Sequence, residues 1–237
     1  YYLYFPAKDK DEIFRIGVAT SKNPAGPFKA RSKPMKGSYS IDPTTFVDDD
    51  GSAYMYFGGI WGGQLQQWES GEFDPQGSLT DLGVASNPAI MPRMAKLKDN
   101  MLEFDEDVKH IQILNQSGKP ILTKELEIRF FEAPWIHKIG DVYYLSYSTG
   151  DTHNLVYATG DNPYGPFTFQ GILGEPVQGW TNHHSTIKIN DQWYLFYHDT
   201  EISGKTHLRN VKFSRFKHND DGSISPIKTY FGSDWKF

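Results

Sequence analysis

The stretch Tyr143-Tyr144-Leu145-Ser146-Tyr147 is one of four short aromatic segments that decide the fold of this chain of 237 residues. The other three are residues 1–5 (YYLYF), 53–57 (AYMYF) and 193–197 (WYLFY). Turn dipeptides precede all but the first: Asp50-Gly51, Gly140-Asp141 and Asn190-Asp191. Aromatic residues favour strands, and these dipeptides tolerate the positive φ of tight hairpins. The sequence therefore predicts four aromatic strands, three of them entered through a hairpin.

A second element repeats nearly letter for letter. Residues 19–28 (ATSKNPAGPF) match residues 158–167 (ATGDNPYGPF) at seven of ten positions, and their Asn-Pro and Gly-Pro pairs predict turns between outer strands. A unit of about 50 residues with four short strands is typical of a propeller blade.

Four such units begin near Tyr1, Ser40, Phe130 and Trp180. The first unit lacks its inner strand. The second carries a long insertion, roughly residues 71–129, which we expect to be a loop excursion with short strands of its own. The ordered units predict an all-β repeat fold, in which the chain begins in the middle of a domain.

Composition narrows the possible partners. The net charge is −5 and no basic run is present, which argues against nucleic acid, and no apolar stretch is long enough to span a bilayer. The absence of cysteine excludes disulfides, thiolate metal sites and cysteine nucleophiles. It leaves the compartment open, although for a bacterial protein we favour a secreted or periplasmic location over the cytoplasm.

Polar residues stand at equivalent points of three units. Eleven residues before the aromatic strands that begin at Ala53, Tyr143 and Trp193 lie Asp42, Glu132 and Asn182, the last followed by His183. These positions begin the inner strands, which surround the central channel of a propeller. We therefore expect an Asp, a Glu and a His to converge at one mouth of that channel.

Each candidate also has a structural interpretation. Asp42 precedes a proline and suits a turn, His183 in a His-His-Ser run is either structural or a ligand, and Trp61 in a glycine-rich loop either stacks on a sugar or anchors the loop. Glu132 lies in the apolar run 130–136 (FFEAPWI), where a carboxylate is seldom buried without a partner or a task. The acidic run 48–51 lacks the ligand spacing of an EF-hand and favours a hairpin turn.

Together these motifs resemble glycoside hydrolase family 43. The resemblance rests on Ser40-Ile41-Asp42-Pro43, on Glu132-Ala133-Pro134-Trp135-Ile136 and on Asn182-His183-His184-Ser185, each leading into an aromatic strand and in this order. The nearest likeness is to the bacterial β-xylosidase and α-L-arabinofuranosidase branch, through residues 4–9 (YFPAKD) and 207–209 (HLR).

The resemblance implies a five-bladed β-propeller with three carboxyl groups at the channel mouth. Glu132 matches the general acid, Asp42 the Asp that modulates the acid's pKa and orients substrate, and His183 the axial His that often helps to hold calcium or water. Arg209 matches a basic residue of the sugar subsite, beside which Trp61 is a candidate for stacking. No segment matches the Asp general base of the family's first blade. We therefore expect residues 1–237 to form one catalytic propeller domain, with blade one and part of blade two absent from this chain.

The implied reaction is inverting hydrolysis of xylosides or arabinofuranosides from xylan, arabinoxylan or arabinan, with no cofactor needed for the chemistry and a possible calcium ion on the axis. Acid and base stand about 6.5–9.5 Å apart in such enzymes, to admit water. Two alternatives stay open: a non-catalytic carbohydrate-binding propeller, and a retaining five-bladed hydrolase that cleaves fructosides. The sequence does not choose between xylose and arabinose.

Overall fold

The computed structural model describes residues 1–77, 86–150, 152–180 and 182–229. This part of the chain is built of β-strands, with two short 3₁₀ turns, η1 (Trp61–Gly63) and η2 (Leu65–Trp68). None of its helices is long and apolar enough to cross a membrane. The all-β prediction is confirmed.

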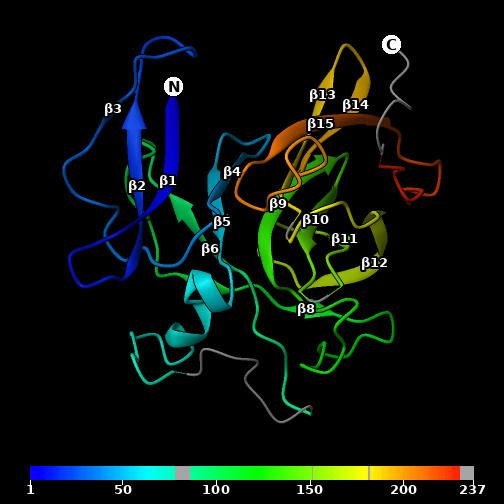
Figure 1. The fold of residues 1–237 in the computed structure, drawn as a ribbon, viewed down its shortest axis with the longest axis horizontal. Helices are drawn as coiled ribbons and strands as arrows, with labels where there is room; N and C mark the ends of the chain where they lie inside the picture. The colour runs from blue at the N-terminus through cyan, green and yellow to red at the C-terminus, as the bar shows by residue number, and fades with distance from the viewer. Residues whose placement is uncertain (78–85, 151, 181, 230–237) are drawn as a thin grey trace.

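The described strands form four sheets arranged around a common centre (Figure 1). The first sheet has the order β1 (Tyr2–Lys8), β2 (Phe14–Thr20), β3 (Lys29–Ala30). The second has the order β4 (Thr44–Val47), β5 (Ala53–Phe57), β6 (Arg93–Leu97), β7 (Lys109–His110). The third runs β9 (Glu132–Ile139), β10 (Val142–Ser148), β11 (Leu155–Gly160), β12 (Phe167–Gly174), β8 (Ile113–Leu114), and the fourth β13 (His184–Ile189), β14 (Gln192–Asp199), β15 (Asn210–Phe216).

The four aromatic segments are the strands β1, β5, β10 and β14, as predicted. In the last three sheets the aromatic strand pairs with an inner strand, β4, β9 or β13, and β9 contacts both of the other inner strands. In the first sheet β1 pairs only with β2 among the described residues. The inner strands therefore gather at the centre, and the order of units read from the sequence is the order of the blades.

The long insertion was predicted wrongly in part. Strands β6 and β7 lie within residues 71–129, but they pair with β5 and with each other, so they are the outer strands of the second blade. β8 pairs in parallel with β12 and belongs to the next sheet. The connections are long because the chain closes one blade and reaches the edge of another before it returns to the centre.

The repeated turn has one geometry in both copies. The side chains of Asn23 and Asn162 each accept a hydrogen bond of 2.9 Å from the backbone two residues on, and each Gly-Pro bond that follows is cis. Both copies lead from one outer strand of a sheet to the next, β2 to β3 and β11 to β12, as predicted. The acidic run 48–51 is a hairpin turn, closed by the bond from Gly51 N to Asp48 O at 2.9 Å.

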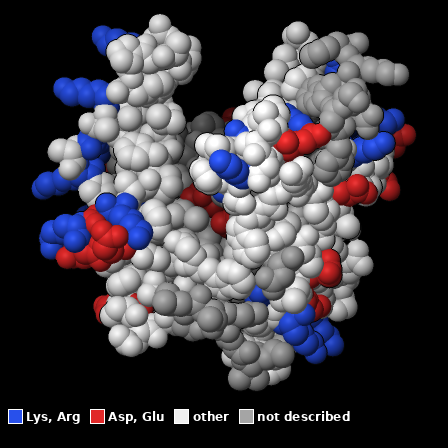
Figure 2. All heavy atoms as spheres, viewed as in Figure 1, with Lys and Arg blue, Asp and Glu red and all other residues white. Residues whose placement is uncertain are grey.

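Burial is uneven across the sheets. All five residues of β5 are buried, whereas apolar side chains are exposed on β1 and on one face of the fourth sheet. On the fourth sheet these include Ile187, Ile189 and Val211, the last with 77% of its surface exposed. Figure 2 shows the molecule hollowed between the first and fourth sheets, with acidic side chains at the bottom of the hollow.

Candidate active site

The starts of the inner strands open into one cavity of about 420 Å³. Asp42 precedes β4, Glu132 begins β9, and His183 directly precedes β13. The cavity is lined by the five residues that the sequence proposed for the site, namely Asp42, Trp61, Glu132, His183 and Arg209, together with Phe131 and Trp180, whereas the registered Asn182 does not line it. Tertiary structure thus brings together side chains from three sheets and two loops.

Asp42 is held close to Glu132 by the backbone. Its φ is 57°, in the left-handed region, and its Oδ2 accepts a hydrogen bond of 3.1 Å from the N–H of Ala133. Burial raises the pKa of Asp42 to about 6, and the negative charge of Glu132 adds to this rise while His183 opposes it. Asp42 is therefore more than the turn residue that its Asp-Pro dipeptide allows.

A β-bulge aims the side chain of Glu132. Trp135 pairs with Ser146 but Glu132 pairs with Ser148, so two residues of β9, Ala133 and Pro134, lie opposite a single residue of β10. The φ of Ala133 is 57°, and the following proline offers no N–H to the ladder. The bulge turns the first residue of the strand into the cavity, where Glu132 is only 6% exposed.

His183 lies between the two carboxylates. Its Nε2 is 3.2 Å from Oε1 of Glu132, and its Nδ1 is 3.8 Å from Oδ1 of Asp42. Burial by itself lowers the pKa of His183, but the contact with Glu132 and the charge of Asp42 outweigh burial, so that the pKa is raised. Among the described residues Oε1 of Glu132 receives no well-aligned hydrogen bond, so its contact with His183 is chiefly electrostatic.

The loop that carries Trp61 is fixed to both carboxylate segments. Gly58 N donates to Ile41 O at 2.8 Å, and Ile60 N donates to Phe131 O at 3.0 Å, so each bond is made to the residue before a carboxylate. A Cβ on Gly59 would lie 2.8 Å from Ile41 and 3.2 Å from Cβ of Glu132. Only glycine lets the loop approach this closely.

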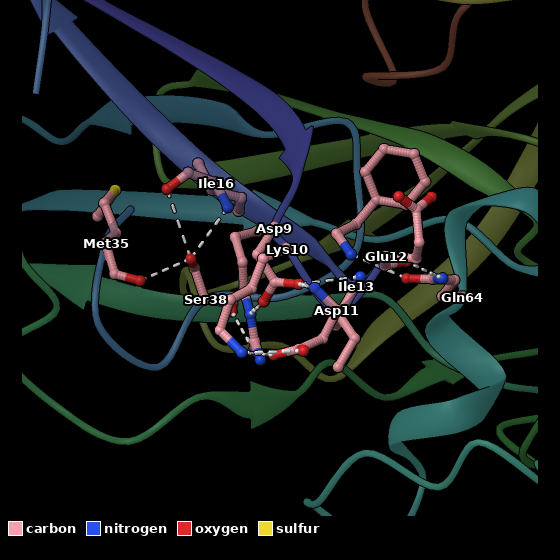
Figure 3. A network of polar contacts seen from close by, with 11 residues as sticks. Asp9, Lys10, Asp11, Glu12, Ile13, Ile16, Met35, Ser38 and Gln64 are labelled. Atoms are coloured by element: carbon pink, nitrogen blue, oxygen red, sulfur yellow. Dashed lines mark hydrogen bonds and ion pairs between the residues drawn. The ribbon is translucent and has the colours of Figure 1, made fainter. Parts of the chain in front are cut away.

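Gln64 joins the same loop to the first sheet (Figure 3). Its side chain accepts a hydrogen bond of 2.9 Å from Phe14 N and donates one of 2.9 Å to Glu12 O. On the other side of that hairpin, Ser38 accepts a bond of 3.0 Å from Ile16 N and donates one of 2.6 Å to Met35 O (Figure 3). The wall of the cavity is thus shared between the first two sheets.

Aromatic rings form one side of the cavity. Trp61 stacks with Trp180 at a centroid distance of 6.4 Å and meets Phe131 edge-on at 5.2 Å. Trp180 is 49% exposed, so an apolar ring lies at the cavity rim. Rings of this kind suit the apolar face of a sugar.

Sequence reasoning missed two residues of this site. Trp180 marked the start of the fourth unit but was not singled out as a site residue, because it precedes the registered position. His198 lies near the end of the aromatic strand β14, which is beside the start of the inner strand β13 because the two strands are antiparallel. A polar residue at the end of an aromatic strand was therefore a signal that could have identified His198 as part of the site. Burial lowers the pKa of His198 to about 4, and the charge of Arg209 adds to this effect.

Asp42, Glu132 and His183 each offer a ligand atom within 4.8 Å of the others. Calcium takes about six to eight oxygen ligands, whereas this set has one nitrogen and two carboxylates with the imidazole between them. A calcium ion held here would need water for most of its coordination shell. When bound it would supply positive charge beside the carboxylates, which a protonated His183 also does.

The sheets are arranged radially around a central cavity, which is the architecture of a β-propeller. Carboxyl groups at the centre of that cavity are the groups that glycoside hydrolysis uses. The family described as Glycosyl hydrolases family 43 matches residues 1–224, and the chain belongs to it. It is 56% identical over 229 residues to a protein of Humicola insolens named Xylosidase/arabinosidase 43A, covering 94% of this chain and 70% of that protein. It is 51% identical to a Xylosidase/arabinosidase of Bacteroides ovatus, covering 96% and 70%.

Solved structures agree in fold. A GH43 β-xylosidase/α-arabinofuranosidase from a compost microbial metagenome, in complex with xylotriose and in a calcium-free form, matches with a TM-score of 0.95 and 61% identity, over 98% of this chain and 71% of that chain. A GH43_1 enzyme from Xanthomonas citri complexed with xylotriose matches with a TM-score of 0.93 and 49% identity, over 98% and 70%. The predicted family and propeller fold are confirmed.

Proposed function

We propose that this protein removes xylose or arabinofuranose from xylan, arabinoxylan or arabinan fragments with inversion at the anomeric carbon. One observation carries the proposal: a single cavity of about 420 Å³ gathers two carboxyl groups, a guanidinium and two tryptophans. The names of the similar proteins from Humicola insolens and Bacteroides ovatus support the choice of pentosides.

Glu132 is proposed as the general acid, and Asp42 as the residue that orients substrate and modulates that acid. An oxygen of Asp42 lies within 4.8 Å of one of Glu132. The two carboxyl groups are thus close enough for the charge of one to act on the other. We propose that the base is a third carboxylate, the Asp that the family resemblance assigns to the first blade, upstream of Tyr1 in the intact protein.

A further blade between the first and fourth sheets is part of this proposal. The exposed apolar faces border the hollow there, and Asp42 and Glu132 lie in the cavity between these sheets. Burying such faces is favourable at about 25 cal/mol per Å², and closing the ring protects strand edges that would otherwise pair with other chains.

The test is turnover by the intact protein of nitrophenyl β-D-xyloside, α-L-arabinofuranoside and fructoside analogues, with the first-formed anomer read by proton NMR. Release of pentose with inversion is expected. Retention, or cleavage of the fructoside analogue alone, would favour the fructoside-cleaving alternative. Sugar binding without turnover would favour the non-catalytic propeller.

A further inference from the structure

His198 touches two residues of the cavity through one atom. It lies near the end of β14, and its Nε2 is 3.2 Å from the backbone N of His183 and 3.3 Å from Nη1 of Arg209. A backbone amide and a guanidinium are both donors and cannot accept. Nε2 of His198 is therefore the shared acceptor, and the ring proton lies on Nδ1.

This contact joins two separate segments of the fourth sheet. His183 directly precedes β13, whereas Arg209 ends the connection between β14 and β15. The other hydrogen bond of the Arg209 side chain within the described residues, from Nε to Thr206 O at 3.2 Å, stays inside its own connection. Across the described part of the chain, only the bond to His198 ties the guanidinium to the segment that carries His183.

We propose that His198 is a positioning residue, whose Nε2 sets the direction of the Arg209 guanidinium relative to His183 and the carboxylates. The inference deepens the proposed function and rests on it. An exposed arginine has many rotamers, and ordering them on binding costs free energy. An acceptor that fixes the guanidinium in advance lowers that cost, so His198 acts on sugar affinity more than on bond cleavage.

The test compares variants of the intact protein with nitrophenyl pentoside. For His198→Leu we expect KM to rise about 10- to 100-fold, the range for hydrogen bonds to charged groups, with kcat within about threefold. His198→Gln places an amide oxygen near the position of Nε2, and we expect it to bring KM back to within about fivefold of wild type. His207→Leu removes an exposed histidine of the same connection and is the matched control, with an unchanged KM.

A double-mutant cycle separates positioning from a general structural effect. In an Arg209→Met background, His198→Leu is expected to change KM less than about twofold, because its partner is already gone. Additive losses, a fall in kcat equal to the rise in KM, or a Gln variant no better than Leu would overturn the inference. Thermal unfolding checks that each variant folds. If His198→Leu does not fold, His198→Gln is used in its place.

Failure of the proposed function and failure of the role of His198 give different results in these measurements. If the wild-type protein neither turns over a pentoside nor binds free xylose or arabinose, the proposed function falls and this inference falls with it. If the wild-type protein is active but the effects of His198→Leu and Arg209→Met on KM are additive, only the role of His198 is overturned.

Discussion

The backbone N–H of Ala133 donates a hydrogen bond of 3.1 Å to Oδ2 of Asp42. Both residues have a left-handed φ, of 57° each, which costs free energy for any residue with a Cβ. The bond connects the start of one blade to the residue after Glu132 in the next. It therefore sets the distance between the two carboxyl groups that the proposed mechanism uses.

Loss of the Glu132 carboxyl group is expected to remove acid catalysis. Glu132→Gln should lower kcat by about 10²–10⁴ for substrates with a poor leaving group, and by much less for those whose leaving group needs no proton. Steady-state kinetics on an aryl series measures this. Glu103→Gln, at an exposed ion pair with Lys98, is the control and should leave both rates unchanged. Equal losses across the aryl series would contradict the acid role.

Asp42→Asn is expected to lower activity and raise stability. With its pKa raised to about 6, folded Asp42 binds its proton more tightly than in the unfolded chain, where aspartates titrate near about 3.9. The resulting stabilisation is present below about pH 3.9 and is lost as pH rises through about 6. The amide side chain of the variant stays neutral, so the variant should be more stable at pH 7 by about 1–3 kcal/mol and equal to wild type near pH 4. Urea unfolding at both pH values tests this, and a variant no more stable at pH 7 would contradict it.

Histidines at buried and half-buried positions are expected to make the fold acid-sensitive. Burial lowers the pKa of His137 and of His184 to about 3, and that of His218 to about 4. Unfolded histidines titrate near about 6.5, so below that pH the unfolded chain binds more protons and stability falls by about 1.4 kcal/mol per pH unit for each. His184→Gln removes one of these groups. It should therefore reduce the slope of the free energy of unfolding against pH, between pH 6 and 4.5, by about 1.4 kcal/mol per pH unit. The exposed His207→Gln is the control, and an equal slope in both variants would refute the assignment.

The segment between β14 and β15, which carries Arg209, is expected to depend on the buried ammonium group of Lys212 for its stability. Lys212, 5% exposed, pairs with Asp199 at 2.6 Å and also with Glu201. Lys212→Met leaves buried negative charge without this cation, which should cost about 3–5 kcal/mol in the free energy of unfolding and raise KM. The matched control is Lys188→Met, since Lys188 pairs with Asp191 on the surface and should cost under about 1 kcal/mol. Comparable Tm values for the two variants would contradict the prediction.

Gly59 is expected to admit no side chain. Gly59→Ala would press a methyl group against Ile41 and Glu132, and we expect a loss of about tenfold or more in kcat/KM from displacement of the acid. Gly171→Ala is the control, because its Cβ would meet only a ring atom of Tyr157 at 3.8 Å. A Gly59→Ala enzyme with wild-type kinetics would show that the loop yields without moving Glu132.

Much of the fold could be read from local chemistry. The aromatic segments and their turn dipeptides predicted one strand of every sheet, because strand propensity and hairpin geometry depend on neighbours in sequence. Registering those strands then placed Asp42, Glu132 and Asn182, the last followed by His183, at equivalent strand starts. Short strands were expected within residues 71–129, but β6 and β7 were not assigned to the second blade, since strands with little periodic signal are defined by the partners they find.

The sequence by itself determined the repeat, the blade order and the residue types at the channel mouth, because each of these follows from local pattern and register. Only the tertiary structure decided how the site is built. The bulge at Ala133 aims Glu132, the imidazole of His183 lies between two carboxylates, and Nε2 of His198 serves two donors at once. These relations join residues on different strands or sheets, and their distances and pKa shifts arise from burial and charge that exist only once the blades pack together.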